Sequence, residues 1–202
     1  MGYALVEAAL AGGHEVVLVS GPTSLSPPSG AVLRPVTSAL EMQAAVDDAL
    51  AQSVPKIDVI FAVAAVTDFR PERRRPGKPP KSESNLALKL VPNPDILFEL
   101  GRRRSSGELE VALVGFALQA GTQEENLADG RAKLERKHLD MIVVNHRSAI
   151  GAAVSEVTLV FADGRTVPLP KRDKADHAAR ILGAALETLA GTSRAQDGGG
   201  AP

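Results

Sequence analysis

The sequence has no cysteine among its 202 residues, and aromatic residues make up only 3% of it. The absence of cysteine excludes disulfides, thiolate metal sites and cysteine nucleophiles. Hydrophobic residues nevertheless make up 44% of the chain, so its core must be built from Ala, Val, Leu and Ile. Such a core is typical of parallel strands that helices cover on both faces. The length suits one α/β domain.

Long apolar runs and an excess of one charge sign are also missing. No apolar run approaches the ~20 residues that cross a bilayer, and the start of the chain lacks the charged-then-apolar order of a signal peptide. The net charge of −1 gives no general attraction to nucleic acid or to an acidic membrane. We therefore expect a cytoplasmic protein with neither as a partner, in which phosphate affinity comes from a local cluster.

Apolar strands and helical patterns alternate along the first third of the chain. The predicted elements are a helix over Met1–Ala11 and strands over Glu15–Ser20, Ala31–Val36 and Val59–Val66. Ser38 and Glu41 have the spacing of a capping box, which predicts a helix between the last two strands. This order favours an α/β fold, Rossmann-like and doubly wound, with a mostly parallel sheet. Because such a unit opens with a strand, we expect one strand before Met1 to be missing.

The remainder continues this pattern and then ends in a hairpin and a helix. The predicted elements are strands over Val111–Phe116 and Met141–Asn145, a helix over Glu124–Lys137, a hairpin of Val157–Phe161 and Arg165–Leu169, and a helix over Lys174–Leu189. Residues 191–202 are polar and rich in glycine, which predicts a disordered tail. We therefore expect one domain over residues 1–190.

Residues 67–84 interrupt the pattern with prolines and cations. Six of the cations fall within residues 70–81: Arg70, Arg73, Arg74, Arg75, Lys78 and Lys81. Such a segment cannot bury itself, so we expect an exposed loop. A solvated loop and a flap that closes over phosphates are equally compatible with this composition. Residues 85–91 then alternate apolar and polar, as in a half-exposed antiparallel strand.

Several polar or aromatic residues follow the predicted strands, where parallel sheets bind their ligands. Gly21, Asp68, Phe116 and Asn145 occupy such positions. Asn93–Leu97 (NPDIL) begins a helix, with Pro94 suited to the first position, and its free N–H groups could hold an anion or simply be capped. Lys133 and Lys137 share one helical face, as a phosphate clamp or an ordinary surface pair.

In their joint order and spacing, several motifs closely resemble the phosphopantothenate–cysteine ligase family. They are VAAVTDFRP at 63–71, NPDIL at 93–97, VGF at 114–116, the lysines at 133 and 137, and LDMIVVN at 139–145. The resemblance implies a Rossmann-like sheet with an added antiparallel dimerisation element. It also implies a homodimer that condenses 4′-phosphopantothenate with cysteine. In this family the substrate carboxylate attacks CTP to form an acyl-cytidylate, and Mg²⁺ and protein cations offset the phosphate charge.

The resemblance also implies residue roles. Ala62, Val63 and Ala64 would line the cytidine through their backbone, and Asp68 would hold the nucleotide or its metal. Lys78 would be catalytic, because it supports formation of the acyl-cytidylate. The residues expected around the base or facing the nucleotide are Pro94, Asp95, Ile96, Leu97, Phe116, Lys133 and Lys137.

The sequence departs from the family pattern in its first segment. A glycine-rich nucleotide loop would precede Met1, so we expect one strand position of the core to be empty. The flavin-dependent half of the bifunctional relatives is also absent, so no flavin is expected. Three hypotheses remain: a CTP-dependent acid–amino acid ligase, an inactive nucleotide-binding or dimerising remnant of it, and an NAD(P)-dependent oxidoreductase. The last lacks a G-x-G-x-x-G after a strand.

Overall fold

The computed structural model describes residues 1–73, 77, 87–146 and 154–197. The first half contains α1 (Gly2–Ala11), β1 (Val17–Ser20), β2 (Val32–Pro35), α2 (Ala39–Gln52), β3 (Val59–Ala62), β4 (Phe69–Pro71) and β5 (Leu90–Pro92). The second half contains α3 (Ile96–Ser105), β6 (Ala112–Gln119), α4 (Gln123–Arg136), β7 (Met141–His146), β8 (Val154–Phe161), β9 (Thr166–Asp173) and α5 (Lys174–Asp197).

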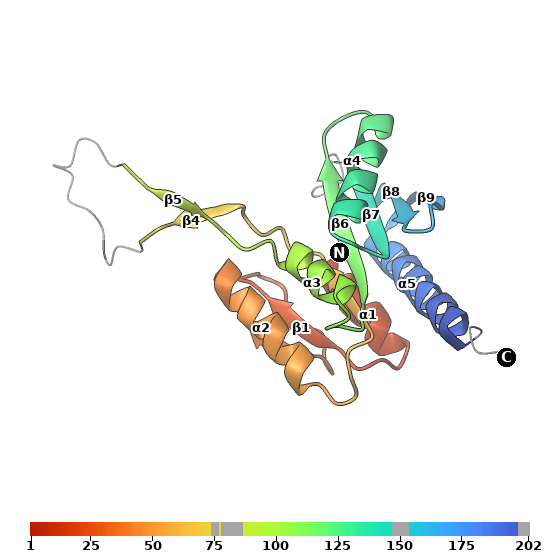
Figure 1. Cartoon of the computed structure of the whole chain (residues 1–202), viewed down its shortest axis with the longest axis horizontal. Coiled ribbons are helices and arrows are strands. Elements are labelled where there is room, and N and C mark those ends of the chain that lie inside the picture. The colour runs from red at the N-terminus through yellow and green to blue at the C-terminus, as the bar shows by residue number, and fades with distance from the viewer. Residues whose placement is uncertain (74–76, 78–86, 147–153, 198–202) are drawn as a thin grey trace.

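The central sheet has the strand order β3-β6-β7-β8-β9. β3, β6 and β7 are parallel, and the β8–β9 hairpin adds two antiparallel strands at one side. Helices lie on both faces of this sheet (Figure 1). The predicted α/β class with a mostly parallel sheet is therefore confirmed.

The core has two parts, one on each face of the central sheet. On one face α1 and α5 pack on the sheet, with Leu5 and Ile181 buried there. On the other face α3 and α4 contribute Leu100 and Leu134. Neighbouring residues of β6 point to opposite faces, as the pleat of a strand requires. The apolar runs predicted to be central strands are thus buried from both sides.

β1 and β2 form a separate two-stranded parallel sheet. Among the described residues, β1 and β3 are not hydrogen-bonded neighbours, and the first turn of α1 lies near the carboxyl ends of both. Tyr3 Oη lies 3.1 Å from Ser20 Oγ on β1, and a Cβ on Gly2 would lie 3.8 Å from Val63 Cβ, just past β3. Among the described residues, β1 and β2 are therefore separate from the central sheet, and the expected empty strand position stays a prediction.

Local hydrogen bonds account for the differences in element boundaries. The Asp95 side chain accepts the Phe98 N–H at 3.1 Å and caps α3, so Pro94 precedes the cap and does not occupy the first helical position. The third strand ends at Ala62 and does not reach Val66, because the Val63 N–H turns back to the Phe61 carbonyl at 3.1 Å. The last helix runs past Leu189 to Asp197.

The predicted capping box of α2 is only half formed. Ser38 accepts the Glu41 N–H at 3.2 Å, as expected. The Glu41 carboxylate, however, accepts the Thr37 N–H at 2.6 Å and the Thr37 hydroxyl at 2.8 Å. The helix begins where Ser38 predicts it. The Glu41 carboxylate, however, bonds Thr37 and not the Ser38 backbone N–H that a full capping box requires.

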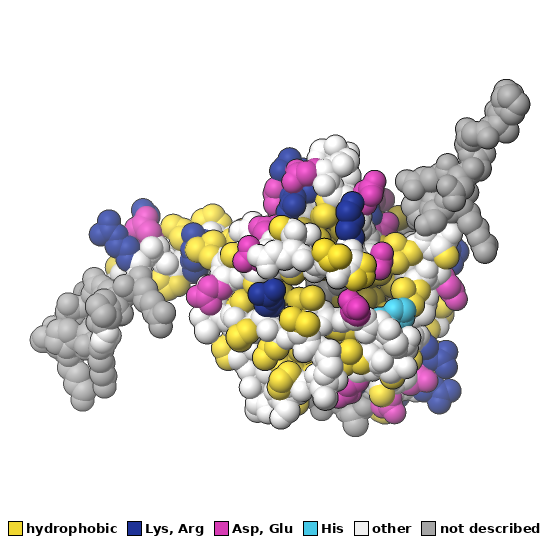
Figure 2. Space-filling view, turned by 90° about the horizontal axis from the view of Figure 1, so that it is seen from below, with side chains coloured by type: hydrophobic (Ala, Val, Ile, Leu, Met, Phe, Trp, Pro, Cys, Tyr) yellow, Lys and Arg dark blue, Asp and Glu magenta, His cyan; other side chains and the backbone are white. Residues whose placement is uncertain are grey.

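β4 and β5 pair antiparallel to form an arm that extends from the body of the molecule (Figure 1). Three large apolar side chains stay exposed on it: Phe69 (59%), Leu88 (61%) and Leu90 (54%). Figure 2 shows apolar and cationic side chains side by side on this projecting part. The sequence predicted a loop for residues 67–84. Within the described part of this segment that prediction is wrong for Phe69–Pro71, which form β4.

Within the described part of the chain, no helix is both long and apolar enough to cross a membrane.

Candidate functional site

The site is built around the carboxyl end of β3, where the chain leaves the sheet. Ala62 is the last residue of β3 and pairs with Gly115 of β6. Val63 is half-buried and packs with the core on the α1 and α5 face, whereas Ala64 is exposed. The backbone predicted to line the cytidine is thus at the open end of a parallel strand, where ligands of such sheets bind.

Asn93 connects Asp68 to the segment that precedes α3. The Asn93 N–H donates to the Asp68 carbonyl at 2.8 Å, and the Asn93 side-chain amide donates to the Thr67 carbonyl at 2.8 Å. Arg70 donates to the Pro92 carbonyl and to Asn93 Oδ1. The exposed Asp68 is therefore fixed beside the start of α3, although 25 residues separate it from Asn93 in the sequence.

The first turn of α3 approaches the sheet at a glycine. Ile96 and Leu97 are half-buried and pack against the core on the α3 and α4 face. A Cβ on Gly115 would lie 3.3 Å from Leu97 Cδ2 and 2.7 Å from Leu139 Cδ1. Because glycine has no side chain, α3 can start directly over the pairing of Ala62 with Gly115.

Phe116 follows Gly115 and therefore points to the other face of the sheet. Like Val63, it packs against the buried cluster of that face. Leu97 and Phe116 are thus neighbours around the end of β3, but they lie on opposite sides of the sheet. The sequence motifs predicted Leu97 and Phe116 around the same nucleotide base, but they do not specify that the two side chains lie on opposite faces of the sheet.

Lys137 is the residue of the lysine pair that contacts another predicted site residue. It caps the C-terminus of α4, and its Nζ lies 2.7 Å from Asp95 Oδ1. Lys133, one turn earlier, lies 2.7 Å from Asp129 Oδ2 on its own helix. Lys137 therefore contacts Asp95 at the start of α3, and the Asp68 backbone is joined to the same segment through Asn93. Lys133 lies one helical turn before Lys137.

Lys78 lies outside the described residues, so its predicted role stays a prediction. The described residues contain no group of three or more His, Asp or Glu side chains able to hold a metal ion. Mg²⁺ is often held by one or two carboxylates together with substrate phosphates. The exposed Asp68 carboxylate fits a magnesium ion carried by a nucleotide, but not a site formed by protein ligands alone.

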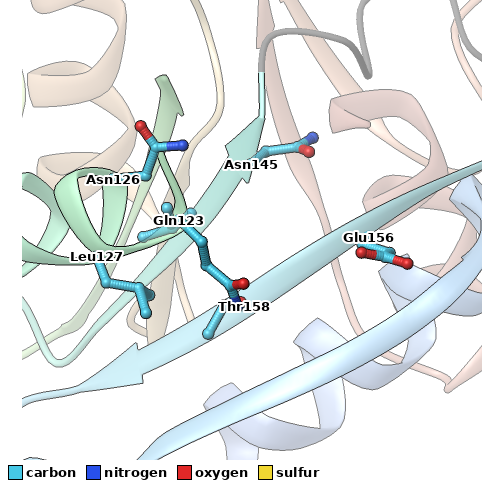
Figure 3. Close-up of a pocket in the computed structure, with 7 residues that line it drawn as sticks. Gln123, Asn126, Leu127, Asn145, Glu156 and Thr158 are labelled. Carbon is cyan, nitrogen blue, oxygen red and sulfur yellow. The ribbon is translucent and has the colours of Figure 1, made fainter. Parts of the chain in front are cut away.

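A separate cavity of about 230 Å³ lies between the start of α4, the end of β7 and the first half of β8 (Figure 3). The residues that line it are Gln123, Asn126, Leu127, Val144, Asn145, Glu156 and Thr158. The Asn145 Oδ1 atom is buried, and among the residues that the structure describes it has no hydrogen-bond partner. Small-molecule sites usually exceed about 300 Å³, so this cavity is too small to enclose a nucleoside triphosphate.

Sequence reasoning singled out only Asn145 of this group, through its position at a strand end. A capping box of Thr122 and Glu125 places α4 beside the cavity, and hydrogen bonds from Thr122 hold the pKa of Glu125 below its ordinary value. Asn126 is buried and bonds Gly121 through both amide atoms. Glu156 and Thr158 sit in an ordinary strand pattern, which contains no signal for a cavity.

Comparisons with known proteins agree on one family. Residues 1–189 match the family described as DNA/pantothenate metabolism flavoprotein C-terminal domain. The coenzyme A biosynthesis bifunctional protein CoaBC of Bacillus subtilis (strain 168) is 42% identical over 188 residues, which are 90% of this chain and 43% of that protein. The CoaBC protein of Mycobacterium tuberculosis (strain ATCC 25618 / H37Rv) is 34% identical over 200 residues, covering 95% and 47%. The chain thus spans about half the length of these curated relatives.

Solved structures share the fold. The crystal structure of the C-terminal domain of a coenzyme A biosynthesis bifunctional protein CoaBC is 32% identical with a TM-score of 0.74, and the match covers 93% of this chain and 81% of that chain. A DNA/pantothenate metabolism flavoprotein from Streptococcus pneumoniae has a TM-score of 0.73 at 18% identity, covering 92% and 86%. This chain therefore belongs to the family of DNA/pantothenate metabolism flavoprotein C-terminal domains.

Proposed function

We propose that this chain is a ligase of coenzyme A biosynthesis that condenses 4′-phosphopantothenate with cysteine at the expense of CTP. The observation that carries the proposal is that the segment at the start of α3 is joined both to Lys137, through Asp95, and to the Asp68 backbone beyond β3, through Asn93. The names of the relatives support a role in coenzyme A biosynthesis. Shared fold alone would not support a function.

The proposed reaction has two steps. An oxygen of the phosphopantothenate carboxylate attacks the α-phosphorus of CTP, the bond from that phosphorus to the bridging oxygen breaks, and pyrophosphate leaves. The amine of cysteine then attacks the acyl carbon, CMP leaves, and the nitrogen loses a proton. Both steps bring anions together, so the chain must supply cations and N–H donors where charge accumulates.

The residues at the end of β3 can supply these groups. Free N–H groups in the first turn of α3 and the backbone of 62–64 would hold the base and ribose. Lys137 lies beside the start of α3, held by Asp95 at 2.7 Å. Its ammonium could move from this carboxylate to a phosphate, since a compact point charge suits a multiply charged anion. Lys133 would add a second charge on the same face of α4.

Mg²⁺ bound to the triphosphate would neutralise part of its charge, with Asp68 as the protein ligand. Lys78 lies between β4 and β5 in the sequence and would bring a further cation to the α-phosphate during the first step. No flavin takes part in this chemistry.

We further propose that the enzyme works as a homodimer in the cytoplasm, with phosphopantothenate bound across the subunit boundary. The arm of β4 and β5 is the candidate dimerisation element. Its exposed Phe69, Leu88 and Leu90 would be covered by a second copy.

Pyrophosphate release tests the proposal. The purified chain is incubated with CTP, Mg²⁺ and phosphopantothenate, and the exchange of labelled pyrophosphate into CTP is followed before cysteine is added. Exchange that depends on phosphopantothenate, and that gives way to CMP and the amide product when cysteine is present, supports the ligase. CTP binding without exchange indicates the inactive remnant. Hydride transfer to NAD(P) without exchange indicates the oxidoreductase.

A further inference from the structure

The corner between α4 and β7, residues 137–140, contacts α3 at three levels along its length. At the N-terminus of α3, Lys137 Nζ pairs with Asp95. At its middle, a Cβ on Gly101 would lie much closer to the Lys137 carbonyl oxygen than the 3.0 Å that real Cβ atoms keep. At its end, Arg104 donates to the Asp140 carboxylate and to the His138 carbonyl.

The contact at the C-terminal end of α3 also involves the central sheet. The Asp140 carboxylate also accepts the Leu113 N–H of β6 at 2.7 Å, and the backbone N–H of Asp140 donates to the Leu113 carbonyl at 3.0 Å. The side chains of Arg104 and Asp140 are only 25% and 21% exposed. Charge-assisted bonds that are shielded from water in this way are the stronger and more directional ones. Arg104 thus joins the last turn of α3 to the start of two parallel strands.

Gly101 permits the close approach. It is buried in the middle of α3, where glycine costs stability relative to alanine in the helix itself. The backbone of α3 lies directly against the carbonyl of Lys137 at this point, and any side chain would force the two apart. A helix held at its middle and its end by backbone and charge contacts has a defined tilt, and the tilt determines where its N-terminus lies.

We propose that Gly101, Arg104 and Asp140 are positioning residues for the nucleotide site. They set the tilt of α3 against the 137–140 corner and so place its first turn, with Asp95, at the distance that Lys137 requires. None of the three lies at the end of β3, so they act through α3 and not by contact with substrate. The inference rests on the proposed function in so far as that first turn binds the base of CTP.

Arg104→Met is the first test, with Arg102→Met as the matched control. Arg102 lies in the same last turn, but its ion pair is with the exposed Glu99. We expect Arg104→Met to raise the KM for CTP about two- to thirtyfold, the range of couplings carried through intervening residues. The KM for phosphopantothenate should stay unchanged, Arg102→Met should leave both values unchanged, and Arg104→Lys should restore part of the loss.

Gly101→Ala is the second test. Gly183→Ala, on α5, is the control, because there the new Cβ meets nothing within 4 Å. It makes the same glycine-to-alanine change in a helix without crowding a neighbour. We expect Gly101→Ala to raise the KM for CTP and Gly183→Ala to leave it unchanged.

Amide hydrogen exchange separates failure of this inference from failure of the ligase proposal. Arg104→Met should speed exchange at Phe98 and Glu99, in the first turn of α3, in the protein without ligands. A wild-type chain that neither binds nor turns over CTP overturns the ligase proposal, and the exchange result alone then decides the positioning role. Unchanged exchange at these amides, or an unchanged KM for CTP in a wild type that is active, overturns the positioning role.

Discussion

Lys137 Nζ and Asp95 Oδ1 lie 2.7 Å apart, and the same Asp95 oxygen accepts the Phe98 N–H at 3.1 Å. One carboxylate thus caps α3 and holds the lysine at the end of α4. Lys137 is mostly buried, with 18% of its side chain exposed, whereas Asp95 is 47% exposed. The pair joins two helices that lie on the same face of the sheet.

A double-mutant cycle of Lys137→Met and Asp95→Asn measures this coupling. We expect a coupling energy of about 0.2–1 kcal/mol, because one partner is half exposed and water screens the charges. Asp95→Ala should cost a further ~0.5–2 kcal/mol, because alanine also removes the helix cap. Urea unfolding of the single and double variants gives these values. Additive effects of the two single changes would show that the pair contributes no coupling.

Lys78→Gln should abolish pyrophosphate–CTP exchange in a protein that stays folded. A cation that acts only where negative charge accumulates in the transition state affects the reaction and not the core. Exchange of labelled pyrophosphate and the thermal midpoint are measured together, with Lys81→Gln as the control from the same segment. Exchange at the wild-type rate would exclude Lys78 from the first step.

Lys133→Ala should weaken CTP more than phosphopantothenate. A charge-assisted bond to a phosphate is worth about 1.5–3 kcal/mol, or roughly ten- to a hundredfold in affinity. Titration calorimetry with each ligand gives the comparison. Arg136→Ala is the control, because Arg136 is an exposed cation in the same last turn of α4. Equal losses for both ligands would contradict the placement of Lys133 at the nucleotide.

Gly115→Ala should destabilise the fold by about 1–3 kcal/mol, the usual cost of overpacking a core. The new Cβ would lie 2.7 Å from Leu139 Cδ1 and 3.3 Å from Leu97 Cδ2. Leu139→Val shortens the crowded side chain, so the double variant should lose less than the sum of the two single losses. Urea unfolding gives the free energies of unfolding. If the losses of the two single variants simply added in the double variant, Leu139 would not be the side chain that the new Cβ crowds.

Stability should fall in acid partly through Glu125. The backbone N–H of Thr122 donates to its carboxylate at 2.8 Å, and this bond lowers the pKa of Glu125 below the ordinary 4.5. A carboxyl whose pKa is lower in the folded protein stabilises the fold fully above pH 4.5, and this contribution is lost as the pH falls through the folded value. Unfolding at pH 7 should therefore distinguish the wild type from Glu125→Gln more clearly than unfolding at pH 3. Glu124→Gln serves as the control from the same turn.

Secondary structure was predictable where local signals are strong. Buried apolar runs predicted β3, β6 and β7, and the Ser38 side chain caps the helix that it was expected to start. The errors occurred where one hydrogen bond decides the boundary, as at Asp95, which takes the capping position and leaves Pro94 outside α3. Neither the end of β3 nor the β4 strand could be read from residue pattern, because both depend on turns and pairing partners.

By itself, the sequence determined the α/β class, the family and the candidate residues, because hydrophobic periodicity and motif spacing are properties of the chain read in order. Only the tertiary structure decided that Lys137 meets Asp95, that Leu97 and Phe116 lie on opposite faces, and that Gly101 rests against the Lys137 carbonyl. These relationships depend on the tilt of helices and the register of strands. Both are set by the packing of distant segments, and no local pattern specifies them.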